Sequence, residues 1–253
     1  NVVGSVTSAG ALVTANVPAT ITQSPVSLAV NPGLDAVFSV VAGGTEPLTY
    51  QWRRNGVALA GQTGASLILS AVQAANAGSY DVVVSNLAGS ATSTSAALSV
   101  NTPVAITAQP VSVALNLGGA TTFSVKAGGT APLTYQWFRN GEPIGGATSA
   151  SLVLGPVEAT DAGMYRVAIS NVVGTVNSAE AQLSINVPPS IALDPAPVSV
   201  NAGTLASFAV TATGTAPLTY QWRKNGTPIA GATAATYFIA AVQSIHVGAY
   251  DVV

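Results

Sequence analysis

The side chains that most often carry catalysis or bind metals are scarce in this sequence. There is no cysteine, and His246 is the only histidine, so a Cys-His nucleophile pair is excluded. Catalysis needs titratable groups that converge on a pocket. His246 instead lies in a predicted turn, where we expect a local hydrogen bond and neither a base nor a metal ligand.

The acidic residues are dispersed and do not form the dense set of oxygen ligands that Ca²⁺ requires. They are Asp35, Glu46, Asp81, Glu142, Glu158, Asp161, Glu180, Asp194 and Asp251. There are enough of them for the two carboxylates that a glycosidase needs. However, no groove that could hold a sugar chain is evident. The sequence therefore predicts no catalytic, cofactor or metal site, and we expect that the protein is not an enzyme.

The basic residues gather at one repeated position, the end of a predicted strand before an Asn-Gly turn. Five of the seven lie there: Arg53, Arg54, Arg139, Arg223 and Lys224. They could form a repeated patch that meets an acidic neighbour. The alternative, which we favour, is a solvated strand end whose charge blocks aggregation.

The overall charge excludes several classes of partner. Seven Lys or Arg against nine Asp or Glu give a net charge of −2, so no basic face is available for nucleic acid. No apolar run approaches the roughly 20 residues that cross a bilayer, so we expect no membrane insertion in this segment. Charged residues make up 6%, against about 25% in typical domains. Such a surface is either prone to nonspecific association or covered by neighbouring chains or glycans.

A sequence period of 85 residues runs through the whole chain without insertion or deletion. The Tyr-Gln-Trp triplet that begins at Tyr50 returns at Tyr135 and Tyr220. The same interval relates other triplets: Phe38, Phe123 and Phe208; Gly33, Gly118 and Gly203; Tyr80, Tyr165 and Tyr250; Pro18, Pro103 and Pro188. A fixed period of this kind is the signature of a tandem array.

Each unit has the pattern of short, half-buried strands. Residues 36–40, 48–52 and 80–84 alternate apolar and polar side chains, as strands with one buried face do. Asn55-Gly56 follows the second of these, and its copies recur in both later units. Asn-Gly favours a tight hairpin because both residues tolerate positive φ. About seven short strands per unit predict an all-β sandwich.

These motifs resemble those of the I-set immunoglobulin domain, in the cysteine-free form of large bacterial surface or secreted repeat proteins. The tryptophan of each triplet matches the buried tryptophan of strand C, and residues 161–165 (Asp-Ala-Gly-Met-Tyr) resemble the D-x-G-x-Y run of the tyrosine corner. The aspartate of that run, Asp161, is replaced by Asn76 in the first copy and by His246 in the last. The resemblance specifies the fold more than the function, which depends on individual sites.

The resemblance also implies which residues form the core. Valines stand where the family usually has two bridging cysteines, so apolar packing against the tryptophan should replace the disulfide. The expected core residues are Trp52, Trp137, Trp222, Tyr80, Tyr165, Tyr250, Val40, Val82, Val125, Val167, Val210 and Val252.

The period divides the chain into four parts. Residues 1–17 correspond to strand G of a preceding repeat, residues 18–102 and 103–187 are complete immunoglobulin-like domains, and residues 188–253 form a domain that lacks its strand G. The connections are short and contain proline, which makes them semi-rigid. We therefore expect tandem β-sandwiches arranged as an extended rod.

Two explanations are open for the ends of this array. In the first, which we favour because the last residues stop within a strand, the polypeptide is a longer array. In the second, residues 1–17 of one subunit complete the last domain of another by strand donation, which would propagate head-to-tail. The candidate donor residues are Ser5, Val6, Thr7, Leu12 and Val13.

One outward strand position is apolar in all three units. Strand alternation places Ile68 on the solvent face, and its copies are Val153 and Phe238. Solvent-facing strand positions are usually polar. The three residues could form a lateral contact with a neighbouring chain, and the alternative is strand propensity alone.

The sequence as a whole favours a structural or adhesive extracellular protein, a rod or a segment of a surface filament. Its expected partners are copies of itself or further repeats of the same chain, with a glycan or another cell-surface ligand as a further option. The alternative is a spacer or carbohydrate-binding region of a large secreted enzyme.

Overall fold

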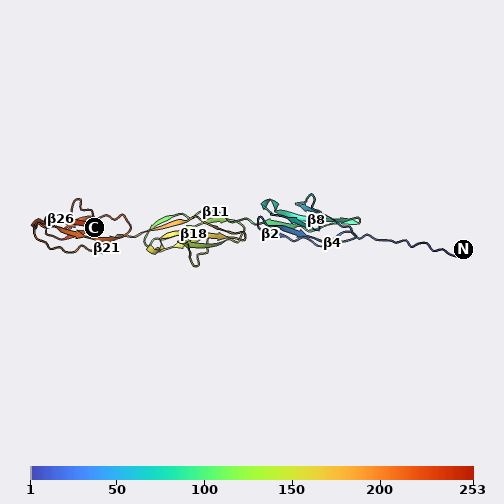
Figure 1. Cartoon of the computed structure of the whole chain (residues 1–253), viewed down its shortest axis with the longest axis horizontal. Helices are drawn as coiled ribbons and strands as arrows, with labels where there is room; N and C mark the ends of the chain where they lie inside the picture. The colour runs from blue at the N-terminus through green and yellow to red at the C-terminus, as the bar shows by residue number, and fades with distance from the viewer. Residues whose placement is uncertain (1) are drawn as a thin grey trace. The chain divides into compact units, whose positions relative to one another are not determined.

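The computed structural model describes residues 2–253 as an all-β chain, in which the helices are single turns of 3₁₀ helix. Sheets form among strands of the same 85-residue unit, so the strands fall into three sets within residues 20–100, 105–186 and 190–252 (Figure 1). Each set builds its own sandwich. The boundaries at residues 18, 103 and 188 stay predictions.

The first set has ten strand segments and one 3₁₀ turn. They are β1 (Thr20–Gln23), β2 (Leu28–Val30), β3 (Ala36–Ser39), β4 (Val41–Gly43), β5 (Thr49–Arg54), β6 (Val57–Ala58), β7 (Ser66–Leu69), η1 (Ala74–Asn76), β8 (Gly78–Asn86), β9 (Gly89–Thr92) and β10 (Ala96–Val100). One layer has the order β2-β10-β8-β5-β6, with β9 also on β8, and the pairs β1-β4 and β3-β7 form the other. Among the described strands of this first set, only β2 and β10 pair in parallel.

The seven expected strands account for these ten segments because three of them are divided. The N-terminal strand changes layer, since β1 pairs with β4 and β2 pairs with β10. Only Val40 separates β3 from β4, which pair with β7 and β1 respectively. The last strand is divided into β9 and β10, and both halves pair with β8.

The second set repeats this order. Its elements are β11 (Ala105–Ala108), β12 (Val113–Asn116), β13 (Thr121–Ser124), β14 (Lys126–Gly128), β15 (Thr134–Arg139), β16 (Glu142–Pro143), β17 (Ser151–Leu154), η2 (Ala159–Asp161), β18 (Gly163–Ser170), β19 (Thr175–Asn177) and β20 (Ala181–Asn186). The larger sheet is β12-β20-β18-β15-β16, and β11-β14 and β13-β17 face it.

The third set has fewer strands. It contains β21 (Ser190–Leu193), β22 (Ala206–Ala209), β23 (Thr211–Thr213), β24 (Trp222–Lys224), β25 (Thr227–Pro228), β26 (Thr236–Ile239), η3 (Ser244–His246) and β27 (Tyr250–Val252). Its sheets are β21-β23, β22-β26 and β25-β24-β27. In the described residues, no strand pairs with β27 on the side away from β24.

The predicted Asn-Gly hairpins are present between β5 and β6, β15 and β16, and β24 and β25. Asn55 and Gly56 have φ angles of 50° and 81°. Positive φ at both central residues is the geometry that reverses a twisted strand in two residues, and asparagine and glycine adopt it at low cost.

Each sandwich is centred on its tryptophan. Trp52, Trp137 and Trp222 are fully buried, and the Trp52 indole nitrogen donates to the carbonyl of Gly64 at 2.9 Å. Phe38 lies 6.2 Å from the Trp52 ring and stacks on Tyr80 at 5.1 Å between ring centroids. The same aromatic cluster recurs in the other two sandwiches.

The valines at the expected cysteine positions lie beside this aromatic cluster. Val82 and Val167 are fully inaccessible, and Val40 and Val125 are also buried. In the third sandwich Val210 is buried, but Val252 is only half-buried. With no cysteine in the chain, apolar contact is the only link between the layers at these positions.

We expect Trp137→Ala to destabilise the second sandwich by about 3–5 kcal/mol, the usual cost of removing a large aromatic side chain from a core. Chemical denaturation followed by circular dichroism measures this loss. Met164→Ala, at an exposed position of the same unit, is the matched control, and reducing agent should change neither protein. Equal midpoints for the two variants would contradict the core assignment.

Candidate strand-acceptor groove

The tyrosine of each unit is tied to the 3₁₀ turn that precedes it. The Tyr80 and Tyr165 hydroxyls donate to the carbonyls of Asn76 and Asp161, both at 2.7 Å, and Tyr250 donates to His246 at 2.8 Å. Burial raises the pKa of all three phenols above the ordinary value. The hydroxyls therefore stay protonated and remain donors to these turns.

His246 has the local role that its turn position predicts. Its Nδ1 accepts a hydrogen bond from the backbone N–H of Gln243 at 3.0 Å. Asn76 and Asp161 accept the equivalent bond through a side-chain oxygen. The position thus requires an acceptor, which an amide, a carboxylate or a neutral imidazole can supply. In residues 2–253, no three His, Cys, Asp or Glu side chains are grouped as metal ligands would be.

Three of the five basic residues at the end of strand C donate hydrogen bonds to this turn, a contact that the sequence analysis did not anticipate: Arg54, Arg139 and Lys224. All five are half-buried. Arg54 donates to the carbonyls of Ala75 and Ala77, and Lys224 donates to the carbonyl of Ile245. Backbone carbonyls of a single helical turn lack partners within the turn, and the cations supply them.

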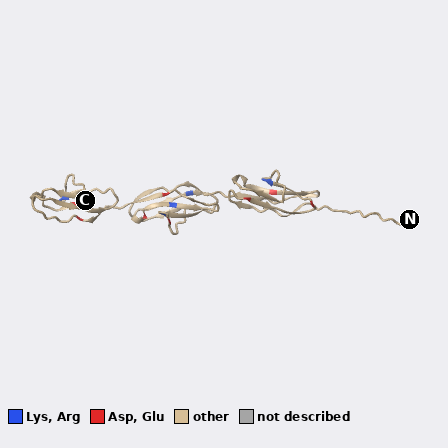
Figure 2. Ribbon diagram, viewed as in Figure 1, with Lys and Arg blue, Asp and Glu red and all other residues tan. Residues whose placement is uncertain are grey.

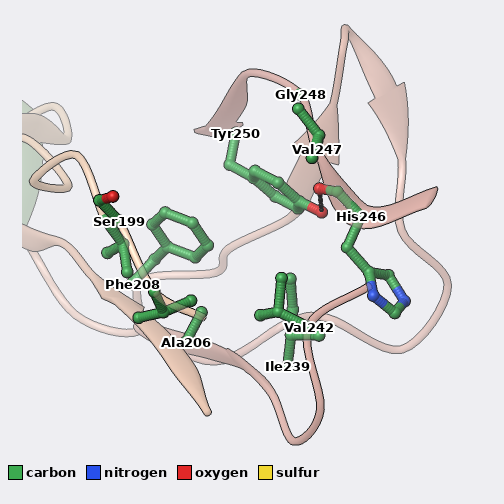
Figure 3. A pocket seen from close by; sticks show the side chains of 11 residues that line it. Ser199, Ala206, Phe208, Ile239, Val242, His246, Val247, Gly248 and Tyr250 are labelled. Carbon is green, nitrogen blue, oxygen red and sulfur yellow. Dashed lines mark hydrogen bonds between the residues drawn. The ribbon is translucent and has the colours of Figure 1, made fainter. Parts of the chain in front are cut away.

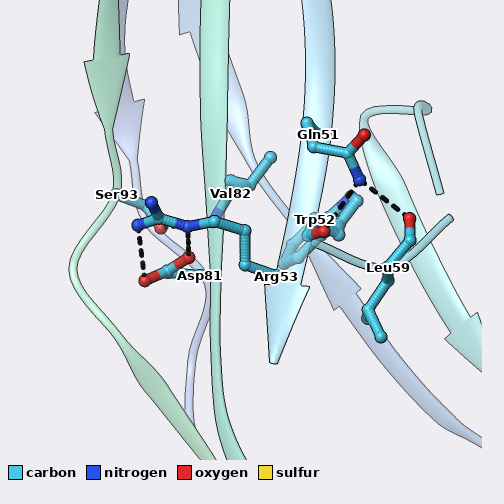
Figure 4. A network of polar contacts seen from close by, with 7 residues as sticks. All are labelled: Gln51, Trp52, Arg53, Leu59, Asp81, Val82 and Ser93. Carbon is cyan, nitrogen blue, oxygen red and sulfur yellow. Dashed lines mark hydrogen bonds and ion pairs between the residues drawn. The ribbon is translucent and has the colours of Figure 1, made fainter. Parts of the chain in front are cut away.

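Outward residues of neighbouring strands form bidentate ion pairs in two units. Arg53 contacts Asp81 through Nε at 2.6 Å and Nη2 at 2.9 Å (Figure 4). Arg223 and Asp251 repeat this pair, and the hydrogen bond from Arg223 lowers the pKa of Asp251. The Arg223–Asp251 pair is more than a third exposed at both ends, so solvent limits its contribution to stability. Figure 2 shows how few charges the strands carry overall.

An open groove lies beside β27 in the third unit. It is lined by Val198, Ser199, Val200, Ala206, Phe208, Ile239, Val242, His246, Val247, Gly248 and Tyr250 (Figure 3). In the first unit the residues equivalent to 198–200 form β2, and those equivalent to 248–250 begin β8. There, β10 pairs with both of them. The groove is therefore the place that β10 fills in the first unit and β20 fills in the second.

Side-chain exposure reflects this difference. Ala96 and Leu98 of β10 are buried in the core of the first unit, and Phe38, Tyr80 and Val82 beneath them are at most 1% exposed. In the third unit the equivalent Phe208, Tyr250 and Val252 are only half-buried. Tyr250, an expected core residue, thus contacts Phe208 at 4.8 Å but also borders the groove.

A buried serine fixes the register of the strand that fills this place in the first two units. The Ser93 hydroxyl accepts the Val82 N–H at 3.1 Å, and the Ser93 N–H donates to the Val82 carbonyl at 3.0 Å. Ser178 and Val167 repeat both bonds. Because each serine is almost wholly buried, its hydroxyl satisfies a backbone donor that water does not reach. The sequence analysis did not single out these serines.

Comparison with known proteins decides the family. Residues 18–86 and 103–171 match the immunoglobulin domain family, which covers more than half of the chain. The chain belongs to this family. The immunoglobulin domain explains the buried tryptophan, the tyrosine bonded to a preceding turn and the two-layer sheet order.

The relatives of this chain in sequence are different kinds of protein. The chain is 30% identical to human Roundabout homolog 3 over 220 residues, which is 82% of this chain. It is 33% identical to Endoglucanase C of Cellulomonas fimi over 180 residues, or 66% of this chain. The matched region spans only 16% of the length of each relative.

Solved immunoglobulin structures share the fold. A three-domain titin fragment, I67–I69 carrying an E-to-A substitution, superposes with a TM-score of 0.78. The match covers 94% of this chain and 93% of the titin chain at 22% sequence identity. Within residues 2–253 of this immunoglobulin chain, none of the helices has the length and apolar character of a membrane span.

The predicted contact residues all lie at the surface of the immunoglobulin array. The candidate donors Ser5, Val6, Thr7, Leu12 and Val13 are exposed and outside any strand. Separately, the lateral positions are in β7, β17 and β26, with exposed fractions of 59% for Ile68, 74% for Val153 and 66% for Phe238.

We expect Ser178→Ala to destabilise the second immunoglobulin domain by about 1–3 kcal/mol, because the buried Val167 N–H would lose its acceptor. Urea denaturation measures the loss, with Ser151→Ala at an exposed position as the control. A Ser178→Ala protein as stable as the control would show that this hydroxyl does not hold the last strand in register.

Proposed function

We propose that the chain is a non-catalytic structural or adhesive protein, a segment of an extracellular rod or surface filament that assembles through its β-strands. The observation that carries this proposal is the open groove beside β27, combined with a segment of matching sequence at residues 4–15. The groove offers apolar side chains and the unpaired edge of a strand, the two features that strand addition uses.

Residues 4–15 repeat the sequence features of β9 and β10. One 85-residue period relates Gly4 to Gly89, Ser8 to Ser93 and Val13 to Leu98. In the register of the first domain, Ser8 would accept the N–H of Val252, and Val13 would enter the groove between Gly248 and Val198. Leu12 would then face outward, as Ala97 does from β10.

The partner in this proposal is a second copy of the chain or a further immunoglobulin repeat. Donor and acceptor lie in different parts of the sequence, so repeated donation between copies is head-to-tail and open-ended. The donor is exposed and the groove has apolar side chains in its wall, among them Phe208, Ile239 and Val242, which supports this pairing. Ile68, Val153 and Phe238 provide a separate lateral contact between chains.

The proposed location is the surface of a bacterial cell, where a glycan or another surface molecule is a further candidate ligand. The low fraction of charged residues supports a surface that neighbouring chains or glycans cover. The core needs no disulfide, so its stability does not depend on an oxidising compartment.

A second candidate function is that of a spacer or carbohydrate-binding region in a large secreted enzyme. The observation behind it is the 33% identity with part of Endoglucanase C. Binding to insoluble cellulose tests the carbohydrate-binding form of this second candidate: binding would support it, and a chain that does not bind would exclude that form.

We expect the 253-residue chain to form species larger than 24.9 kDa in sedimentation velocity, and Val13→Asp to abolish this head-to-tail association. A carboxylate at this position would lose the apolar contact of Val13 and would have to be desolvated, which costs free energy. Leu12→Asp is the matched control because its side chain would face solvent, and it should associate like the parent. A parent that remains monomeric at all concentrations, or two variants that behave alike, would refute strand donation.

A further inference from the structure

The smaller sheet of every immunoglobulin domain ends in an open strand. β7, β17 and β26 each pair with one strand only, namely β3, β13 and β22. In the described chain no strand lies on their other side. The residues between β6 and β7 are held elsewhere, since Gln62 and Gly64 accept hydrogen bonds from Trp52.

The register identifies which backbone groups of β7 are unpaired. The Val40 N–H donates to the Ala65 carbonyl at 3.1 Å, which makes residues 40 and 65 a hydrogen-bonded pair. Hydrogen-bonded pairs alternate along an antiparallel ladder. Phe38–Leu67 is therefore also a bonded pair, whereas in Val37–Ile68 the N–H and carbonyl of Ile68 point to the open side.

The same reasoning applies to the other two domains. Val125 donates to Ala150 and Val210 donates to Ala235, both at the equivalent position. The open backbone groups are thus those of Val153 and Phe238. In each domain, one residue presents both an exposed apolar side chain and an unpaired N–H and C=O.

These short open strands lack the side chains that usually protect an edge strand from pairing. Their sequences are Ser-Leu-Ile-Leu, Ser-Leu-Val-Leu and Thr-Tyr-Phe-Ile, without charge, proline or glycine. Natural proteins usually place a lysine, a proline or a bulge on such an edge to prevent pairing. Val37, opposite Ile68, is also exposed at 52%, which widens the apolar surface.

We propose that these edges pair antiparallel with the same edges of a second copy of the chain, so that the two smaller sheets become one. This rests on the lateral contact in the proposed function and specifies how it is made. Antiparallel pairing is self-complementary, because Ile68 opposite Ile68 of the second copy exchanges both backbone hydrogen bonds. The uncharged strands do not repel each other, and each copy carries three such edges.

The test uses the 253-residue chain with Val13→Asp, in which any remaining association is lateral. Amide hydrogen exchange is measured by NMR at low and high protein concentration. We expect the amides of Ile68, Val153 and Phe238 to become protected only at high concentration. The Leu67 amide, bonded within the domain, should be protected at both. Association without protection of the three amides would overturn edge pairing but leave a lateral contact between faces.

A proline variant provides the second arm. This variant carries three substitutions, Ile68→Pro, Val153→Pro and Phe238→Pro. They remove three N–H groups that form no hydrogen bond within the domains. Proline is tolerated where a strand N–H faces solvent. We expect loss of the lateral association. The threonine variant of the same positions keeps the N–H groups and should retain amide protection at high concentration. A proline variant that associates as strongly as its Val13→Asp parent would overturn the proposal. A monomeric Val13→Asp chain would overturn both edge pairing and the lateral contact. Head-to-tail donation is tested separately, by comparing the association of the unmodified chain with that of Val13→Asp.

Discussion

Burial of one tryptophan between two sheets, without a disulfide, is the constraint on which each domain depends. The Trp52 ring contacts Phe38, and its indole N–H is bonded to Gly64, so the ring is fixed by packing and by one polar contact. Phe38 in turn stacks on Tyr80, whose hydroxyl holds the 3₁₀ turn. The turn is braced by Arg54. A chain of contacts thus leads from the centre of the core to the surface.

The third domain shows what this core loses when the place of the last strand is open. Its tryptophan is still fully buried, because Phe208 and Tyr237 pack against its ring and Val210 lies in the same cluster. Phe208, Tyr250 and Val252 nevertheless become half-buried. In the first domain β10 covers the equivalent apolar surface, and the hydrophobic effect favours such coverage.

The sequence predicted the features that repeat with the 85-residue period. The tryptophan, the tyrosine and the Asn-Gly hairpins could be placed because their residue types have narrow structural roles. Two-residue alternation was enough to place Ile68, Val153 and Phe238 on the outer face. The role of His246 also followed, since its copies are an asparagine and an aspartate in a turn.

Other features could not be predicted because they depend on which strands lie side by side. Arginines at a strand end look solvated in sequence, whereas Arg54 reaches carbonyls more than twenty residues away. Ser93 and Ser178 look like ordinary polar strand residues, and only the tertiary fold shows that each hydroxyl meets a buried N–H. The unpaired N–H of Ile68 likewise follows from the register between β3 and β7.

A structure of the assembled chain, determined by electron cryomicroscopy, tests the central claim of strand completion most directly. The account predicts a strand between β27 and residues 198–200 of each internal copy, antiparallel to β27. The Ser8 hydroxyl of one copy should lie within hydrogen-bonding distance of the Val252 N–H of the next. An assembly in which this groove is empty, while the copies are joined through other surfaces, would contradict the account.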